Sequence, residues 1–248
     1  MRLDVLGGCG AWPTARQGCS GYVVDSGGFR LLIDPGYATL PRLWEREGGV
    51  DGIDAVLVSH GHPDHCADLN PLLRARDLSD EPPEALGVYA PVGAVDAVLA
   101  LDKPGMLADA YDLHEFGPGQ RFEIGPFRVD TWLLPHFVPN AGVRLSAEGA
   151  VLAYTGDTGP SEDVPRLARE ADVLLSEATY PYEVPRADAD FLLTAHLAGG
   201  YATRAGAGHL VLTHLWPGTD RDVALEAGAA SFGGTLSVAE PGLVVPAG

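Results

Sequence analysis

The amino-acid sequence predicts a layered α/β fold, and three observations support this prediction. Apolar strand-like runs alternate with segments of helical pattern along the chain. The composition, with 46% hydrophobic and 20% charged residues, is that of a globular protein, and 248 residues suffice to bury a sizeable core. No linker rich in serine and glycine and no internal repeat divides the chain, so we expect a single domain over residues 1–248.

Strand patterns bounded by turn residues mark the first half of the chain. Gly7-Gly8 follows the first strand, and Ser26-Gly27-Gly28 separates the next two as a hairpin turn does. Gly48-Gly49 ends a helical pattern. Residues 103–115 fit either a loop or a lid. The expected strands are 2–6, 20–25, 29–33, 55–59 and 88–90, and the expected helices are 40–47, 67–76 and 91–101, the last with a proline at its start.

Longer strands and helices alternate in the second half. Residues 127–134 alternate enough to form a half-buried strand. Glu148-Gly149 forms a turn between two further strands, and Ser161 can cap the helix that follows it. Residues 180–192 are irregular. The expected strands are 127–134, 141–146, 150–155, 172–176 and 209–213 with two short ones at the end, and the expected helices are 161–170, 194–205 and 220–230.

The strand at 55–59 leads into a dense group of metal-binding residue types. His60, His62, Asp64 and His65 fall within six positions, although the chain has only 8 histidines in 248 residues. Neutral imidazoles and carboxylates suit Zn²⁺ and related divalent ions. Four donors exceed what one tetrahedral ion needs from one loop. We therefore expect His60 and His62 to serve one metal ion, and Asp64 and His65 to serve a second.

Three later residues repeat the layout of this loop. His136, Asp157 and His214 each follow an apolar strand-like run and precede a loop containing glycine or proline. Ligand-binding side chains gather where strands end on one rim of a sheet. Each residue alone could be an ordinary loop histidine or a helix cap, but together with the first loop they predict a shared site.

The run Ser59-His60-Gly61-His62-Pro63-Asp64-His65 resembles the HxHxDH signature of the metallo-β-lactamase fold. With the later segments, the resemblance covers nearly the whole chain. It implies a four-layer αββα sandwich and a centre of two divalent metal ions, with Zn²⁺ the first expectation and Mn²⁺ or Fe the alternatives. Such a pair lowers the pKa of a shared water and supplies a bridging hydroxide. The resemblance assigns His60, His62 and His136 to one ion, Asp64, His65 and His214 to the other, and Asp157 as the bridge.

Two motifs resemble the RNase Z branch of this fold and its phosphodiesterase relatives. They are Tyr154-Thr155-Gly156-Asp157-Thr158 and Ser176-Glu177-Ala178-Thr179-Tyr180. RNase Z has a histidine where this chain has Ser176. It also inserts a tRNA-gripping arm between the positions of His136 and Asp157, which here are only 21 positions apart. Four segments, at residues 20–22, 59–66, 154–160 and 212–215, carry a nearer resemblance, which is to actinobacterial-type phosphodiesterases that include cyclic-AMP hydrolases. It implies a metal-dependent hydrolase of a small phosphodiester such as a cyclic nucleotide.

The chain departs from the family pattern at one position. A family histidine thought to protonate the leaving oxygen aligns with Leu192, and His196 lies one helical turn further on. His196 is either a replacement or a surface histidine. We take Asp64 and His196 as candidate catalytic residues. Asp34 and Glu177 are candidates for holding the tautomers of ligating histidines, although either could instead form a turn.

Charge and composition limit the partners. With 16 basic against 34 acidic residues, the net charge of −18 disfavours a long nucleic acid and leaves a small anionic substrate drawn by the metal ions. No apolar run approaches the roughly 20 residues that span a membrane, and the N-terminus does not resemble a signal peptide. Three cysteines favour reduced thiols and a cytoplasmic location, with Cys66 a packed thiol rather than a ligand. The sequence leaves a homodimer open.

Other readings remain at this point. Metal-activated water attacks a carbonyl carbon as readily as phosphorus, so a lactonase or thioesterase fits the same ligands. An RNase Z-like tRNA 3′ endonuclease and a non-catalytic metal sensor are further alternatives. The four tryptophans are expected in the core, with Trp216 the one that could instead line the pocket because it follows His214 by two positions.

Overall fold

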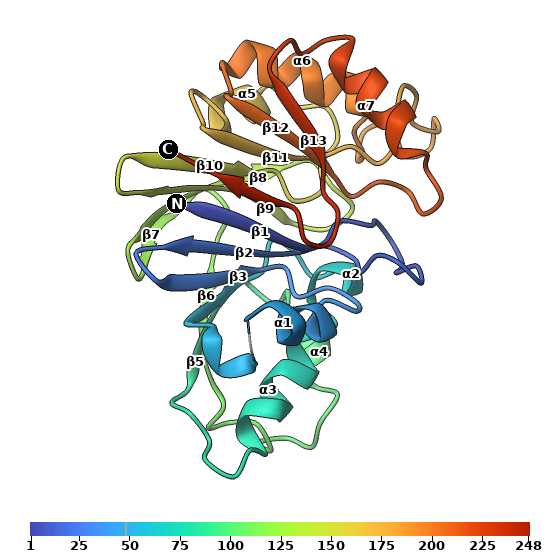
Figure 1. Ribbon diagram of the computed structural model, residues 1–248. Helices are drawn as coiled ribbons and strands as arrows, with labels where there is room; N and C mark the ends of the chain where they lie inside the picture. The colour runs from blue at the N-terminus through green and yellow to red at the C-terminus, as the bar shows by residue number, and fades with distance from the viewer. Residues whose placement is uncertain (48) are drawn as a thin grey trace.

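Two seven-stranded sheets pack face to face, with helices on the outer side of each (Figure 1). The computed structural model describes residues 1–47 and 49–248. Each sheet contains three antiparallel and three parallel strand pairs, so the two halves of the chain have similar layouts. This arrangement is the four-layer αββα sandwich, and the predicted fold class is confirmed.

The first sheet has the order β14-β1-β2-β3-β4-β5-β6. Its helices lie on the lower side of the molecule in Figure 1. The strands are β1 Arg2–Gly7, β2 Gly21–Ser26, β3 Phe29–Ile33, β4 Ala55–Leu57, β5 Leu86–Pro91, β6 Tyr111–Phe116 and β14 Val244–Pro246, and the helices are α1 Leu40–Glu47, the 3₁₀ turn η1 Val50–Gly52, α2 Pro63–Cys66, α3 Leu69–Asp77 and α4 Asp96–Leu99.

The second sheet has the order β13-β12-β11-β10-β9-β8-β7. Its helices form the upper layer in Figure 1. The strands are β7 Arg121–Ile124, β8 Phe127–Leu134, β9 Asn140–Ala147, β10 Ala150–Tyr154, β11 Val173–Glu177, β12 His209–Thr213 and β13 Thr235–Val238, and the helices are α5 Asp163–Leu167, α6 Ala195–Ala205 and α7 Arg221–Ala229.

Alternation along the strands builds three hydrophobic clusters. In β3, Leu31 and Ile33 pack between the two sheets, whereas Leu32 faces the helices of the first sheet. In β12, Val211 faces the inter-sheet core and Leu210 faces the upper helices. Because both faces of each sheet are covered, these strands are apolar on both sides. Rigid strands packed in this way hold the loops at their ends in place.

Several elements differ from the sequence prediction. The helix expected at 91–101 is reduced to α4, because Pro91 is the last residue of β5 and Gly93 adopts a φ of 74° that a helix does not tolerate. The helix expected at 161–170 is only α5, and Glu170 has a left-handed φ of 50°. Strands β6 and β7 were not expected, and β6 overlaps the end of the segment 103–115, which was expected to be a loop or a lid. The glycine expected to end α1 at position 48 lies outside the described residues.

Three of the four tryptophans are not core residues. Trp12, Trp44 and Trp216 are 49%, 44% and 36% exposed, so the core expectation is wrong for them. Trp132 is partly buried and packs against the cluster beneath the upper helices. Two of the exposed rings, those of Trp12 and Trp216, belong to segments that contact the candidate site.

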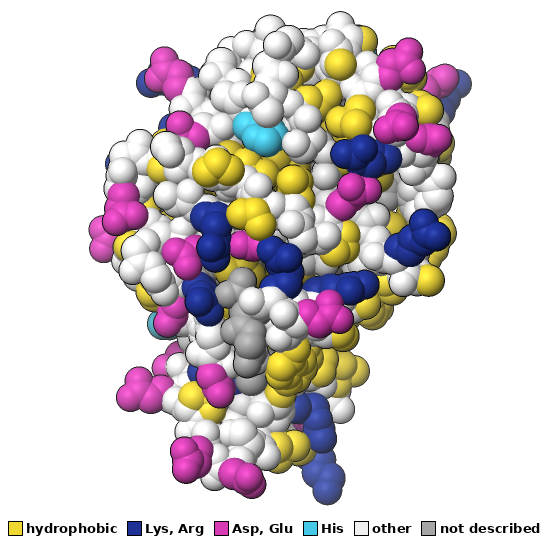
Figure 2. Space-filling view, viewed as in Figure 1, with side chains coloured by type: hydrophobic (Ala, Val, Ile, Leu, Met, Phe, Trp, Pro, Cys, Tyr) yellow, Lys and Arg dark blue, Asp and Glu magenta, His cyan; other side chains and the backbone are white. Residues whose placement is uncertain are grey.

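Charged side chains of both signs are interspersed on the face seen in Figure 2. Many of the basic groups are engaged in ion pairs: Arg2 with Asp4, Arg74 with Asp102, and Arg204 with Glu162. Among the described residues, no helix is both long and apolar enough to cross a membrane.

Candidate metal centre

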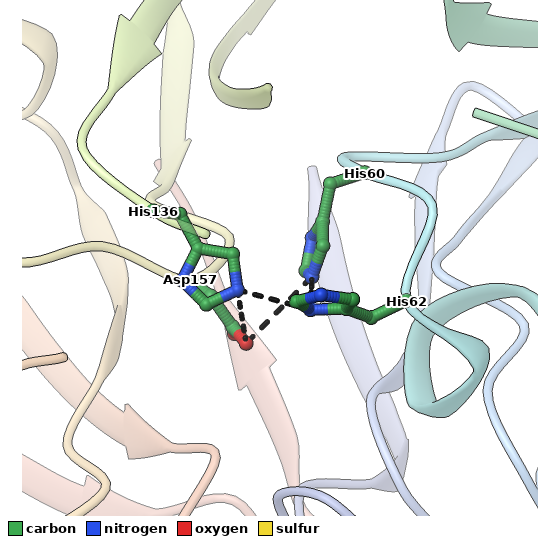
Figure 3. A group of neighbouring side chains, drawn as sticks. All are labelled: His60, His62, His136 and Asp157. Carbon is green, nitrogen blue, oxygen red and sulfur yellow. Dashed lines mark hydrogen bonds and ion pairs between the residues drawn. The ribbon is translucent and has the colours of Figure 1, made fainter. Parts of the chain in front are cut away.

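Four strand ends bring the predicted ligands together at one rim of the sandwich. His60 and His62 follow β4, His136 follows β8, Asp157 follows β10 and His214 follows β12. Figure 3 shows His60 and His62 approaching from one side and His136 with Asp157 from the other. Ligands that are far apart in sequence thus converge, because β4 of the first sheet and β8, β10 and β12 of the second end at the same rim of the sandwich.

A short helix separates the ligands of the first loop into two directions. His62 is the N-cap residue of α2, Pro63 occupies its first turn, and the amide of His65 donates to the carbonyl of His62 at 2.9 Å. Proline suits this position because its missing N–H has no partner there. Asp64 and His65 consequently belong to a different ligand group from His60 and His62, although the rings of His60 and His65 lie side by side with centroids 4.1 Å apart.

The first group comprises His60, His62, His136 and Asp157. The Nδ1 atom of His62 lies 3.2 Å from Nε2 of His60 and 3.0 Å from Nε2 of His136. The Oδ2 atom of Asp157 is 3.7 Å and 3.6 Å from the same two Nε2 atoms. Bonds of about 2.0–2.1 Å in a tetrahedron place ligand atoms roughly 3.3 Å apart, so these separations fit one ion.

The second group comprises Asp64, His65, Asp157 and His214. The Nε2 atom of His214 lies 3.2 Å from Oδ2 of Asp64 and 3.1 Å from Oδ2 of Asp157, and Nε2 of His65 lies 3.2 Å from Oδ1 of Asp157. That His65 nitrogen and that Asp157 oxygen are buried without a hydrogen-bond partner. Buried polar atoms seldom stay unpaired, so a cation fits between them. Asp157 is the side chain common to both groups.

Hydrogen bonds fix which nitrogen each of two histidines presents to the site. The carbonyl oxygen of Phe191 lies 3.0 Å from Nδ1 of His136 and can only accept, so this nitrogen carries the proton. The carboxylate of Asp34 accepts in the same way from Nδ1 of His65 at 2.8 Å. The Nε2 atoms of His136 and His65 are therefore the nitrogens that face the other ligands, which is the orientation that metal binding needs.

Two hydroxyl groups extend the same control to His60 and His214. Ser59 donates its hydroxyl to Asp34 at 2.6 Å and so accepts from Nδ1 of His60 at 3.0 Å. Thr179 donates to Glu177 at 2.7 Å and accepts from Nδ1 of His214 at 3.0 Å. The expectation that Asp34 and Glu177 orient ligating histidines is therefore met by contacts, directly for Asp34 and through Thr179 for Glu177.

Burial keeps the histidines of the first group neutral. Desolvation lowers the pKa of His60 well below its usual value, and the neighbouring positive charge of His65 adds to this. Burial likewise lowers the pKa of His62 and of His136, although the charge of Asp157 opposes it. Neutral imidazoles bind a cation without first losing a proton.

In the second group the carboxylates raise the pKa of the histidines, whereas burial lowers it in the first group. Burial lowers the pKa of His65, but the charges of Asp157 and Asp64 outweigh burial and raise it well above its usual value. His214 has a raised pKa for the same reason, since burial is outweighed by Asp157 and by its hydrogen bond to Asp64. Burial raises the pKa of Asp157, and the charges of His214 and His65 lower it overall. Without a cation, protons on these histidines balance the carboxylates.

His196 does not join the predicted ligands. Its side chain is exposed on α6, and its ring centroid lies 6.1 Å from that of Tyr182. Within the described parts of the chain, no hydrogen bond, ion pair or ring contact connects it to either group. Leu192, which stands where the family histidine is expected, is only 7% exposed and has no proton to donate.

Several supporting residues were missed in the sequence. Ser59 and Thr179 stand inside the quoted motifs but were given no role there, and their hydroxyls matter because of the carboxylates that the fold places beside them. The hydroxyl of Tyr154 donates to Asp34 at 2.7 Å across 120 positions. The amide of Ala11 donates to Oδ2 of Asp64 at 2.8 Å. No local pattern announces contacts of such long range.

Most of the chain matches one known protein family. Residues 29–215 match the family described as the Beta-lactamase superfamily domain. The chain belongs to this superfamily. With its two groups of histidine and aspartate able to bind metal ions, this superfamily member is a metal-dependent hydrolase, as predicted.

Known relatives of this hydrolase cover almost its whole length. It is 29% identical to the probable metallo-hydrolase YhfI of Bacillus subtilis, over 98% of this chain and 99% of the relative. The crystal structure of that protein superposes with a TM-score of 0.88 at 28% identity, covering 99% of both chains. A ribonuclease Z of Methanopyrus kandleri is 29% identical over 98% of this chain and 96% of its own. Yeast PDE1 shares the fold, with a TM-score of 0.73 at 12% identity over 98% of both chains.

Proposed function

We propose that this hydrolase cleaves a small phosphodiester, such as a cyclic nucleotide, with two divalent cations, Zn²⁺ first among them. The observation that carries the proposal is the pair of ligand groups that share Asp157. When bound, two cations supply Lewis acidity toward phosphate oxygens and lower the pKa of a water that they share. We further propose that residues 1–248 act as one domain.

The protein residues have separate tasks in this proposal. His60, His62 and His136 offer three neutral nitrogens, so the first ion binds readily at neutral pH. Asp64, His65 and His214 would hold the second ion, and Asp157 is the side chain that could contact both ions. Asp34 holds the rings of His60 and His65 in place, and Glu177 holds the ring of His214, through the contacts described above. Fixed rings matter because a preorganised site loses no energy to reorganisation during the reaction.

A cleft that His136 alone of the proposed ligands lines has a size that suits a small substrate. A cleft of about 460 Å³ opens beside His136 and is lined by Leu133 to Pro139, Ser161 and Asp163. Clefts of about 300–1,000 Å³ are typical for small molecules. Between β8 and β9 there are only residues 135–139, and between β9 and β10 only Glu148 and Gly149. This part of the chain provides no arm for a folded RNA, and the net charge of −18 opposes one.

A tRNA 3′ endonuclease is the second candidate, because the Methanopyrus kandleri relative is a ribonuclease Z. The two candidates need the same ligands and differ in how they hold the rest of the substrate. A precursor tRNA with a 3′ trailer and cyclic AMP, each offered to the zinc-loaded enzyme, separate them. We expect turnover of the cyclic diester and none of the precursor. Efficient cleavage of the precursor alone would transfer the assignment to the endonuclease.

The same assay settles the remaining hydrolase classes. A lactone and a thioester join the panel with bis-p-nitrophenyl phosphate, with and without a chelator, and Asp157→Asn is the matched inactive control. Hydrolysis of the diesters that is lost with chelator supports the proposal. Turnover of carbonyl esters alone would replace it with a lactonase or thioesterase, and metal binding without any turnover would indicate a sensor.

Thiol chemistry supports a reducing location such as the cytoplasm. Cys9, Cys19 and Cys66 are unpaired and buried. Burial raises the pKa of the Cys66 thiol to about 12, which keeps it protonated and fits packing rather than metal ligation. A structure of the zinc-loaded protein with Cys66 bound to a zinc ion would reverse this assignment.

A further inference from the structure

Three aromatic side chains form a continuous group beside the second metal group. Trp216 lies between Tyr180, which stacks on it with ring centroids 5.7 Å apart at 18°, and Trp12, which meets it nearly edge-on at 5.1 Å and 81°. We call Trp12, Tyr180 and Trp216 the aromatic platform. Trp12 and Trp216 are exposed and Tyr180 is half-buried, so the platform presents ring surface to solvent.

The backbone attaches each member of the platform to the metal centre. The amide of Ala11, the residue before Trp12, donates to Asp64 at 2.8 Å. The hydroxyl of Thr179, the residue before Tyr180, contacts Nδ1 of His214 at 3.0 Å. Trp216 follows His214 by two positions, and its amide donates to the carbonyl of Thr179 at 3.0 Å. All three rings therefore start within two residues of groups that ligate or orient the second ion.

Close packing holds the Trp12 loop in this position. The amide of Gly10 donates to the carbonyl of Leu215 at 3.0 Å, and a methyl group added to Gly10 would come within 2.8 Å of the His214 ring. Only glycine lets the backbone pass so close. The loop is thus fitted against the ligand itself, although the ring that it carries remains outside the core.

The chemistry of the platform suits a flat, uncharged group. Aromatic rings favour stacking on other π-systems. No basic residue belongs to the platform, whereas the adjoining cations would take the phosphate. A nucleotide has both features, because a planar base lies beside a charged diester. Stacking on a tryptophan recognises any base through its π-face.

We propose that the aromatic platform stacks the nucleobase of the phosphodiester held at the metal centre, with Trp12 and Trp216 as residues that determine specificity. This inference rests on the proposed function. It deepens that function, because it assigns the base-bearing end of the substrate to the side of Asp64 and His214. The cleft lined by His136 adjoins the first metal group.

A matched pair of substrates tests the platform. Cyclic AMP and the 3′,5′-cyclic phosphate of 1-deoxyribose share the cyclic diester, but only the first carries a base. We expect the zinc-loaded enzyme to prefer cyclic AMP by about 10- to 100-fold in kcat/KM. Trp216→Ala and Trp12→Ala should each lose most of this preference through a higher KM, with the abasic diester changed less than about 2-fold. Trp216→Phe should recover part of it.

Trp44→Ala is the matched control, because Trp44 is equally exposed but lies on α1, outside the platform. It should leave both substrates unchanged. Equal losses on both substrates in Trp216→Ala would show that the platform only supports the fold and would overturn the inference. Unchanged kinetics in both alanine variants would do the same. Zinc content and circular dichroism of each variant confirm that it folds.

Product binding keeps the inference separate from the proposed function. If the wild-type enzyme hydrolyses neither diester, the proposed function fails, but the platform can still be tested. Binding of AMP and of ribose 5-phosphate to the zinc-loaded protein is followed by tryptophan fluorescence and calorimetry. AMP binding that is about 10-fold tighter than ribose 5-phosphate, and that is lost in Trp216→Ala, supports the platform. Equal binding of the two ligands overturns it.

Discussion

The Nδ1 atom of His65 lies 2.8 Å from Oδ2 of Asp34, across 31 positions of sequence. Both side chains are fully buried, and the same carboxylate also accepts from Ser59 and Tyr154. One acidic residue that binds no metal thus orients His65 directly and His60 through Ser59. The two metal groups are therefore coupled through Asp34 as well as through Asp157.

Replacement of this carboxylate should weaken metal binding without removing a ligand. In Asp34→Asn the amide no longer accepts equally from all its partners, so the rings of His60 and His65 lose their fixed tautomers. We expect zinc affinity to fall about 10- to 100-fold, measured by competition with a chromophoric chelator. Asp25→Asn, a partly exposed carboxylate in β2, is the control. An affinity unchanged in Asp34→Asn would contradict the orienting role.

Metal loading should release protons. The carboxylates of Asp157 and Asp64 raise the pKa of His65 and of His214, which favours the protonated rings in the metal-free protein, and a cation must displace such protons. Zinc affinity should therefore rise with pH. Calorimetry in two buffers of different ionisation enthalpy measures the release. Zinc binding without proton release at pH 7 would show that the carboxylates do not protonate these histidines.

Stability of the metal-free protein should fall as pH rises from about 6.5. A histidine with a raised folded pKa contributes stability that is complete below its unfolded pKa and is lost as pH passes its folded value. Glu177 acts with the same sign, since burial and the charge of Asp157 raise its pKa to about 8. Thermal denaturation with a chelator should show a falling Tm from pH 6.5 to 8.5. The zinc-loaded protein should not follow this decline.

The role of His196 stays a prediction that a single variant can test. Because its ring is exposed and has no described contact with the ligands, we expect His196→Ala to reduce kcat by less than about 3-fold on bis-p-nitrophenyl phosphate. Without a protein acid, diesters with leaving groups of low pKa should react fastest. A loss of about 100-fold, confined to substrates with poor leaving groups, would instead establish His196 as the proton donor.

Close backbone packing beneath the site should make one glycine essential for folding. A Cβ at Gly36 would lie 1.9 Å from the carbonyl oxygen of Asp64. Gly36→Ala should destabilise the metal-free protein by at least about 1–3 kcal/mol in urea denaturation. Gly200→Ala in α6 is the matched control, because it meets open space and should stabilise by up to about 1 kcal/mol. Equal stability of the two variants would contradict this packing.

Sequence reasoning succeeded where chemistry was concentrated at strand ends. The dense loop at His60 to His65 and the later His136, Asp157 and His214 gave the groups that the fold brings together, and the family resemblance supplied their partition. The α2 turn was missed within that loop, although Pro63 marks its start. Contacts such as Tyr154 with Asp34 depend on how the two sheets face each other, which no local pattern contains.

The exposure of the tryptophan side chains was also not predicted from the sequence. A tryptophan is expected in the core because burial of its ring is favourable. The amide before Trp12 donates to Asp64, and the amide of Trp216 donates to Thr179, whose hydroxyl contacts His214. These contacts hold both backbone segments at the site and leave the two rings outside the core. Pro91 likewise fits the start of a helix by its sequence pattern, but in the structure it is the last residue of β5 and pairs with Phe116 of β6. In each case a tertiary contact overrode a local preference.

The account depends on seven side chains that clasp two ions about Asp157, and an anomalous difference map of zinc-loaded crystals tests this most directly. Two zinc peaks per chain are predicted, one among His60, His62 and His136 and one among Asp64, His65 and His214, with Asp157 touching both. A single peak, or zinc bound away from these residues, would contradict the account.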